Sequence, residues 1–208
     1  MNAPVREGQL TEWLLRAFAL IAYGFAVSNL ARGWLADPSR WSLLILLLTE
    51  GYTLVLVLFA RRAQLRDMAP LTMVATMYAA FFFVLLSPDG TQHLAPELVG
   101  ISIQGLGLVW QFASKYTLGR SFGLLPAQRG IVIAGPYRVV RHPIYLGYLI
   151  GHVGFLLVNF SWRNCAVIAV LYIAQVVRIV REEKVLCIEP AYRRYRERVR
   201  WRLVPGLF

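Results

Sequence analysis

Residues that build metal sites, disulfide frameworks and soluble surfaces are scarce in this chain of 208 residues. It has two cysteines and three histidines, and neither Cys165 nor Cys187 belongs to a CxxC pair. We therefore expect two free thiols and no metal site. Charged residues make up 16% of the chain, against roughly 25% in soluble domains. This shortage excludes an ordinary soluble globular protein.

Apolar residues are correspondingly abundant. They make up 58% of the chain, and the mean hydropathy is +0.54. Several apolar runs approach the roughly 20 residues that a helix needs to cross a bilayer. They predict an all-α, multi-pass integral membrane protein, a single domain over residues 1–208, with a bundle of five or six membrane segments. The last two runs are short and predict a C-terminal helical hairpin. The runs are approximately Trp13–Leu35, Trp41–Ala60, Pro70–Leu86, Pro96–Ala113, Ile144–Phe160 and Cys165–Val177.

Positive charge is concentrated between and after the apolar runs, and the net charge is +11. Arg61, Arg62 and Arg66 follow the second run, whereas the loop Ser87–Glu97 carries no Lys or Arg. Cytoplasmic loops of membrane proteins are enriched in these residues, so we expect both termini, and the segment that begins at Lys115, to be cytoplasmic. The same rule accounts for the excess charge without nucleic acid, which we do not expect as a partner.

The basic tail after Arg178 contains an amphipathic pattern. Tyr192, Tyr195, Val199 and Leu203 recur at helical spacing, and arginines occupy other faces. This pattern predicts a helix that lies on anionic membrane lipid.

The most unusual stretch of the sequence is Gly135–Gly147, which reads GPYRVVRHPIYLG. Gly135-Pro136 is a turn signal, and Pro143 favours the start of a new helix. Aromatic and cationic side chains gather here between very apolar segments, namely Tyr137, Arg138, Arg141, His142 and Tyr145. Such a concentration at a crossing between membrane segments indicates a binding site.

A second polar stretch, Gln175–Leu186, reads QVVRIVREEKVL. Arg178 and Glu182 are four positions apart and share one face of a helix. Alone, the pair fits a surface salt bridge at the end of a helix. The hairpin, however, returns the chain to the side of Tyr137–Tyr145, so we expect Glu182 and Glu183 to lie close to that stretch.

Taken together, GPY at Gly135–Tyr137, RHPIYLG at Arg141–Gly147 and REEKVL at Arg181–Leu186 resemble the signature of the isoprenylcysteine carboxyl methyltransferase family of membrane enzymes. The resemblance covers about Leu118–Arg202. It implies S-adenosylmethionine as cofactor, bound in a cytoplasmic pocket at the membrane face, with S-adenosylhomocysteine as product.

The resemblance also implies roles for single residues. Residues 115–208 become the cofactor-binding, catalytic half, and residues 1–114 the transmembrane bundle. Arg178 matches the family arginine that faces the substrate carboxylate. Carried over by position, the cofactor contacts are Val132, Tyr137, His142, Pro143, Ile144, Tyr145 and Glu182.

The chemistry of these side chains agrees with that cofactor. The rings of Tyr137 and Tyr145 can stack on adenine or face the sulfonium cation. Glu182 and Glu183 can accept hydrogen bonds from ribose hydroxyls or balance the amino group. We therefore expect both glutamates among the cofactor-binding residues.

The acceptor decides which residues act in catalysis, and we expect Arg178 and Glu182 among them. Methyl transfer needs mainly positioning, and Arg178 can hold a carboxylate through bidentate hydrogen bonds. An amine or thiol must first lose a proton, and Glu182, Glu183 or His142 would then be the base. We favour carboxyl O-methylation of a lipophilic, isoprenylcysteine-like substrate that enters from the bilayer.

Other acceptors and other classes of protein are open alternatives. Phospholipid amine N-methyltransferases share the paired glutamates, and a small lipophilic thiol is a further acceptor. NADPH-dependent sterol-type membrane reductases resemble the same architecture, but Ile144–Gly147 fits the methyltransferase pattern better. A non-catalytic scaffold or transporter would leave both polar stretches without a role.

Glu50 lies in the middle of the second apolar run, where a charge is costly. We consider it a polar lining on the route of the acceptor, and so a substrate-binding candidate, or a partner for a buried arginine. A protonated or hydrogen-bonded glutamate that stabilises helix packing is the alternative.

Overall fold

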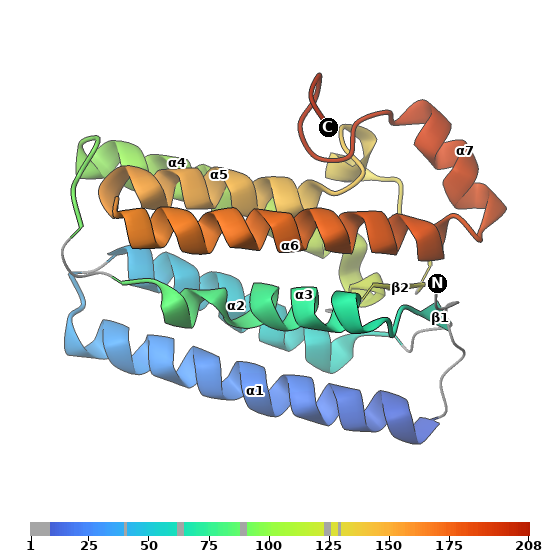
Figure 1. Ribbon diagram of the computed structural model, residues 1–208, viewed down its shortest axis with the longest axis horizontal. Coiled ribbons are helices and arrows are strands. Elements are labelled where there is room, and N and C mark those ends of the chain that lie inside the picture. The colour runs from blue at the N-terminus through green and yellow to red at the C-terminus, as the bar shows by residue number, and fades with distance from the viewer. Residues whose placement is uncertain (1–8, 40, 62–64, 88–90, 123–125, 129) are drawn as a thin grey trace.

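The computed structural model describes residues 9–39, 41–61, 65–87, 91–122, 126–128 and 130–208. Within these ranges the chain is mostly helical, as predicted, and the long helices lie side by side in one bundle (Figure 1). Two-residue strands, β1 (Leu65–Arg66) and β2 (Ala127–Gln128), pair antiparallel. The helices are α1 (Gln9–Ala36), α2 (Trp41–Phe59), α3 (Pro70–Phe81), α4 (Glu97–Leu118), α5 (Pro143–Val158), α6 (Trp162–Leu186) and α7 (Pro190–Arg198), with the 3₁₀ turns η1 (Phe82–Leu85), η2 (Gly119–Ser121) and η3 (Gly135–Arg138).

Helix length and composition identify only some of the predicted membrane segments. Among the described residues, one helix, α6 with 25 residues, is long and apolar enough to cross a membrane. The prediction of a short second hairpin arm is therefore wrong, because the helix continues through the polar stretch up to Leu186. Shorter apolar helices cover Leu47–Phe59, Pro70–Leu85 and Pro143–Val158. The number of membrane segments and their orientation stay predictions.

Helices α4 and α5 pack backbone against backbone because glycines line their contact. A Cβ atom added to Gly107 would lie 2.6 Å from the amide nitrogen of Gly151 and 2.7 Å from the carbonyl oxygen of Gly147. Gly100 and Gly154 repeat this close approach further along. Such small-residue faces let helices approach closely. They fix α5, whose first turn carries the predicted binding residues.

The predicted hairpin of α5 and α6 is confirmed. Ser161 caps the N-terminus of α6 by accepting a hydrogen bond from the amide of Asn164 at 3.1 Å. The loop before α4 meets this turn, because Gln92 and Phe160 form an isolated β-bridge. The turn thus lies at the end of the bundle opposite α7, and α6 brings the chain back to the other end (Figure 1).

The basic tail forms the predicted helix, α7, but its apolar face does not lie on lipid. Tyr192 and Tyr195 are buried and pack with Tyr137 of η3. Leu203 is also buried, although it lies beyond the end of the helix. The apolar face of α7 therefore covers one end of the protein interior, and the prediction of a lipid-facing surface is wrong.

Candidate functional site

One cavity brings the two predicted stretches together at the α7 end of the bundle. Its empty space, including the open mouth, is ≈ 1150 Å³. Pro143 and Glu183 do not belong to its lining. The predicted residues in its wall are Glu50, Val132, Tyr137, His142, Ile144, Tyr145, Arg178 and Glu182.

The local backbone explains how η3 and α5 reach this cavity. Gly135 has a φ of +54°, which glycine adopts without strain, and a Cβ there would lie 2.9 Å from Oγ1 of Thr117. Pro143 occupies the first turn of α5, where its missing N–H has no helical partner. Its carbonyl accepts a hydrogen bond from Nε1 of Trp110 at 2.9 Å. Pro143 thus sets the start of α5 from behind the cavity wall.

Arg178, Glu182 and Tyr145 lie next to one another in the cavity wall. The Tyr145 hydroxyl donates to Oε2 of Glu182 at 3.3 Å, and the guanidinium carbon of Arg178 lies 5.3 Å from the Tyr145 ring centroid. Arg178 is 8% exposed, and its Nη1 donates to Oε1 of Gln175 at 2.8 Å. A buried guanidinium held by an aromatic face and an amide is well placed to bind a carboxylate.

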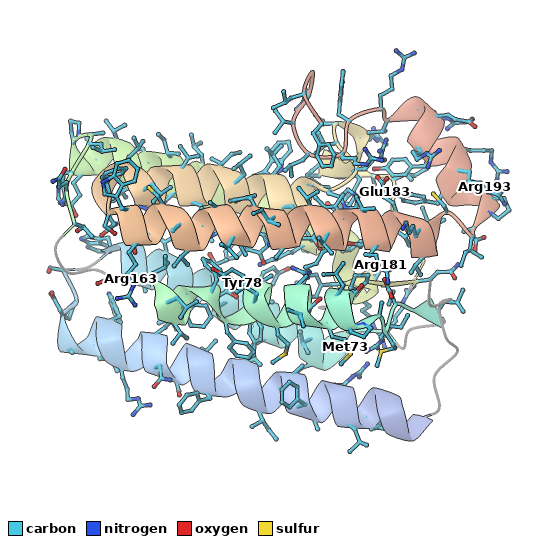
Figure 2. All side chains as sticks on the ribbon, in the orientation of Figure 1. Met73, Tyr78, Arg163, Arg181, Glu183 and Arg193 are labelled. Atoms are coloured by element: carbon cyan, nitrogen blue, oxygen red, sulfur yellow. The ribbon has the colours of Figure 1, made fainter. Side chains whose placement is uncertain are left out.

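Glu183 does not line the cavity, and its carboxylate is held by ion pairs inside the protein. It is 4% exposed, and Nε atoms of Arg141 and Arg202 donate to its two carboxylate oxygens at 2.6 Å and 3.0 Å. His142 Nε2 lies 3.3 Å from the same carboxylate. Figure 2 shows Glu183 on the side of α6 that faces the C-terminal segment, with Arg181 on the other side.

The backbone carbonyls of the C-terminal segment accept hydrogen bonds from Arg141 and His142, which immediately precede α5. Nη1 of Arg141 donates to the carbonyls of Val199 and Arg200, each at 2.8 Å. The amide of His142 donates to the carbonyl of Arg202 at 2.8 Å. Arg141 and Glu183 therefore hold residues 199–202 against the site, and this holds His142 in the wall.

Arg181, from the REEKVL motif, ties α6 to the start of α3. Its Nε lies 2.6 Å from Oδ2 of Asp67. The same carboxylate accepts from the amide of Ala69 at 2.9 Å and from the hydroxyl of Thr72 at 2.8 Å. Arg181 is thus a framework residue that fixes α6 beside the cavity.

An aromatic cluster closes the α7 end of the cavity. Tyr137, Tyr192 and Tyr195 pack together, and the Tyr195 hydroxyl donates to the carbonyl of Tyr137 at 2.6 Å. Burial raises the pKa of Tyr137 well above its usual value, so its hydroxyl stays neutral. Ile131 and Val132 pack against the cluster. Sequence reasoning missed Tyr192 and Tyr195 as wall residues, although their helical spacing was the available signal.

The inner end of the cavity is polar and lies deep among the helices. Glu50 is 5% exposed and interacts with Tyr23 and with Lys115. Lys115, expected among the charges of a loop, is instead fully buried in the last turn of α4. Its Nζ lies 2.7 Å from Oγ1 of Thr53 and 5.1 Å from the ring centroid of Tyr148. The cation that acts on Glu50 is thus a lysine and not the arginine that we considered.

A second cavity adjoins the polar inner end. Its empty space is ≈ 560 Å³, and it shares four wall residues with the first cavity, namely Glu50, Phe82, Tyr148 and His152. The shared residues form a waist between the two spaces. His152 is held at this waist by a hydrogen bond of 2.9 Å between its Nδ1 and the Tyr172 hydroxyl.

The cavity has aromatic rings at one end and a carboxylate, Glu182, near the buried guanidinium of Arg178. This arrangement suits a nucleotide-like cofactor beside an acidic acceptor. Residues 96–192 match the family model described as phospholipid methyltransferase. This range includes α4, α5 and α6 and ends at Tyr192.

A named relative gives the same indication. The chain is 33% identical over 89 residues to protein-S-isoprenylcysteine O-methyltransferase A of Arabidopsis thaliana, an alignment that covers 40% of this chain and 45% of the relative. The chain thus spans less than half the length of that protein. Both matches confirm the resemblance to isoprenylcysteine methyltransferases and their phospholipid methyltransferase relatives.

Proposed function

We propose that this protein is an S-adenosylmethionine-dependent methyltransferase that methylates a lipophilic acceptor at the cytoplasmic face of a membrane. The observation that carries the proposal is the meeting of two distant stretches in one cavity. Tyr137–Tyr145 and Arg178–Glu182 come from separate parts of the chain, and the α5–α6 hairpin places both in the same wall.

The described residues fit the proposed cofactor. Tyr137 and Val132 offer an aromatic and apolar surface to adenine, and Glu182 offers a carboxylate to ribose hydroxyls or to the amino group. The cofactor supplies a methyl group already activated on a sulfonium. Tyr145 presents its ring between Arg178 and Glu182, so its role is to orient the two reactants beside each other.

The acceptor that best fits the site is a carboxylate. Arg178 is buried in the wall, and a carboxylate that it holds can attack without losing a proton. Glu183 is not available as a base, because Arg141 and Arg202 already hold its carboxylate. Glu182 and His142 are the remaining candidates if the acceptor is an amine or a thiol.

The outer surface supports a membrane location. Phe18, Ile21 and Phe25 on α1 are each more than half exposed. Large apolar side chains gathered on one face are typical of a surface that meets lipid or another protein. We infer that the acceptor reaches the cavity from the bilayer, with Glu50 in the wall of its route.

The bond that is formed can be tested with methyl-labelled S-adenosylmethionine. Membranes that contain the protein should transfer label to an organic-soluble product, and mild base should release it as volatile methanol, as a methyl ester requires. The Arg178→Lys variant serves as the control and should lose this product. Label that resists base would contradict the ester and favour an N- or S-methylated acceptor, and no transfer to any membrane extract would overturn the proposed function.

A further inference from the structure

One polar atom in the aromatic end of the cavity, the Tyr192 hydroxyl, is unusual in its hydrogen bonding. Tyr192 is 3% exposed, and its ring belongs to the cavity wall. Its hydroxyl oxygen is buried and finds no hydrogen-bond partner among the described residues. A buried hydroxyl without a partner costs stability, so proteins keep few of them. Such a group in a cavity wall points to a ligand that completes it.

Tyr195 is the natural comparison, because it lies one turn further along the same helix. Its ring centroid is 5.5 Å from that of Tyr192, and both side chains are buried. The Tyr195 hydroxyl, however, donates to the carbonyl of Tyr137 at 2.6 Å. One hydroxyl thus ties α7 to η3, while the neighbouring hydroxyl is left for another partner.

The surroundings of Tyr192 indicate what that partner is. The aromatic cluster is flanked by apolar side chains, which are Leu118, Ile131, Val132, Leu186 and Val199. An apolar, aromatic wall with one well-placed polar group is typical of a site for a flat heteroaromatic ring. Arg178 and Glu182 of the wall lie on α6, outside this packed cluster, while the charges of Glu183, Glu182 and Arg141 act on the Tyr192 hydroxyl. A zwitterionic amino-acid group fits that part of the cavity better.

We propose that the Tyr192 hydroxyl hydrogen-bonds the adenine ring of the cofactor, which makes α7 part of the cofactor site. This inference rests on the proposed function. It gives Tyr192 a role in binding, whereas Tyr195 has a role in folding. Burial raises the pKa of Tyr192, so the hydroxyl stays protonated and can both donate and accept.

The test compares Tyr192→Phe with Tyr195→Phe in the purified full chain. Binding is measured with S-adenosylhomocysteine and with 5′-methylthioadenosine, which keeps the adenosine part but lacks the amino acid. Tyr192→Phe should weaken both ligands by the same factor, about 3- to 10-fold for one hydrogen bond, and should not lower the Tm of the ligand-free protein. Tyr195→Phe should instead lower that Tm by about 2 to 4 °C.

Three results would overturn the inference. Unchanged affinity of Tyr192→Phe for both ligands would show that the Tyr192 hydroxyl makes no hydrogen bond to the cofactor. Weaker binding of S-adenosylhomocysteine alone would move the contact to the amino-acid end. A Tm loss in Tyr192→Phe equal to that in Tyr195→Phe would show that its hydroxyl serves the fold. Failure of the wild-type protein to bind either ligand would instead count against the proposed function itself.

Discussion

At the scale of single residues, two adjacent glutamates on α6 have different surroundings. Glu182 faces the cavity and accepts from Tyr145, whereas Glu183 is enclosed by Arg141 and Arg202. Neighbouring positions on a helix point about 100° apart, so one can meet the ligand while the other meets the protein. The sequence predicts the pair but not this division, because the partners of Glu183 come from two other segments.

The different surroundings of Glu182 and Glu183 predict different effects of the same Glu→Gln substitution. Glu182→Gln should weaken S-adenosylhomocysteine about tenfold and leave the free energy of unfolding unchanged, since it removes a charge from the wall. Glu183→Gln should lower the free energy of unfolding by about 3 kcal/mol, because it leaves the buried guanidinium of Arg141 without its counter-charge. Isothermal titration and denaturant unfolding measure the two quantities, and a reversed pattern would contradict the assignment.

Arg178 provides a separate prediction about the acceptor. Arg178→Lys keeps the charge but loses the planar pair of donors that fits a carboxylate. The kcat/KM for a carboxylate acceptor should fall at least about tenfold, while the Kd for S-adenosylhomocysteine changes less than about twofold. A methyl-transfer assay and a binding titration on the same preparation provide both numbers. Loss of cofactor binding with an unchanged kcat/KM would show that Arg178 serves the cofactor.

At the scale of elements, the contact of α4 with α5 depends on glycine only at certain positions. A Cβ on Gly107 would run into the backbone of α5, whereas a Cβ on Gly105, in the same helix, meets nothing within 4 Å. Gly107→Ala should therefore destabilise the protein by about 1 to 3 kcal/mol. Gly105→Ala should stabilise it by about 0.5 kcal/mol or more, since alanine is the better helix former.

Thermal unfolding of the two alanine variants in detergent decides this point. The Tm should fall for Gly107→Ala and stay level or rise for Gly105→Ala. Equal Tm values for the two variants would mean that α4 and α5 are further apart than the structure has them. Because α5 carries His142 and Tyr145 into the cavity, cofactor affinity should fall together with the Tm of Gly107→Ala.

The elements also show where sequence reasoning succeeds and where it fails. The hairpin was predictable, because two apolar runs flank a polar turn and Pro143 marks the start of the first arm. The position of α7 was not predictable, because an apolar stripe is the same whether it faces lipid or a protein interior. The contact of α7 with Tyr137 of η3, which is distant in sequence, shows that the stripe faces the protein interior.

At the scale of the whole molecule, the residues that we propose for cofactor binding lie toward one end of the bundle. The turn between α5 and α6 lies at the far end, and α7 with the C-terminal segment covers the end with the cavity (Figure 1). Most cavity residues follow position 114, and the two polar stretches of the sequence predicted part of them, whereas Tyr192 and Tyr195 were missed. Six wall residues come from the first half, namely Tyr23, Glu50, Thr76, Ala79, Ala80 and Phe82. Apart from Glu50, which its charge revealed, they were not predictable because their role depends on packing between distant helices.

The most direct test concerns the whole protein and asks which cofactor it binds. Purified full-length protein is titrated with S-adenosylhomocysteine and, separately, with NADPH, and its free energy of unfolding is followed. A saturating concentration of S-adenosylhomocysteine, at about one hundred times its Kd, should stabilise the protein by about 2.7 kcal/mol, and NADPH should add nothing. Stabilisation by NADPH without stabilisation by S-adenosylhomocysteine would contradict a methyltransferase and favour the reductase class.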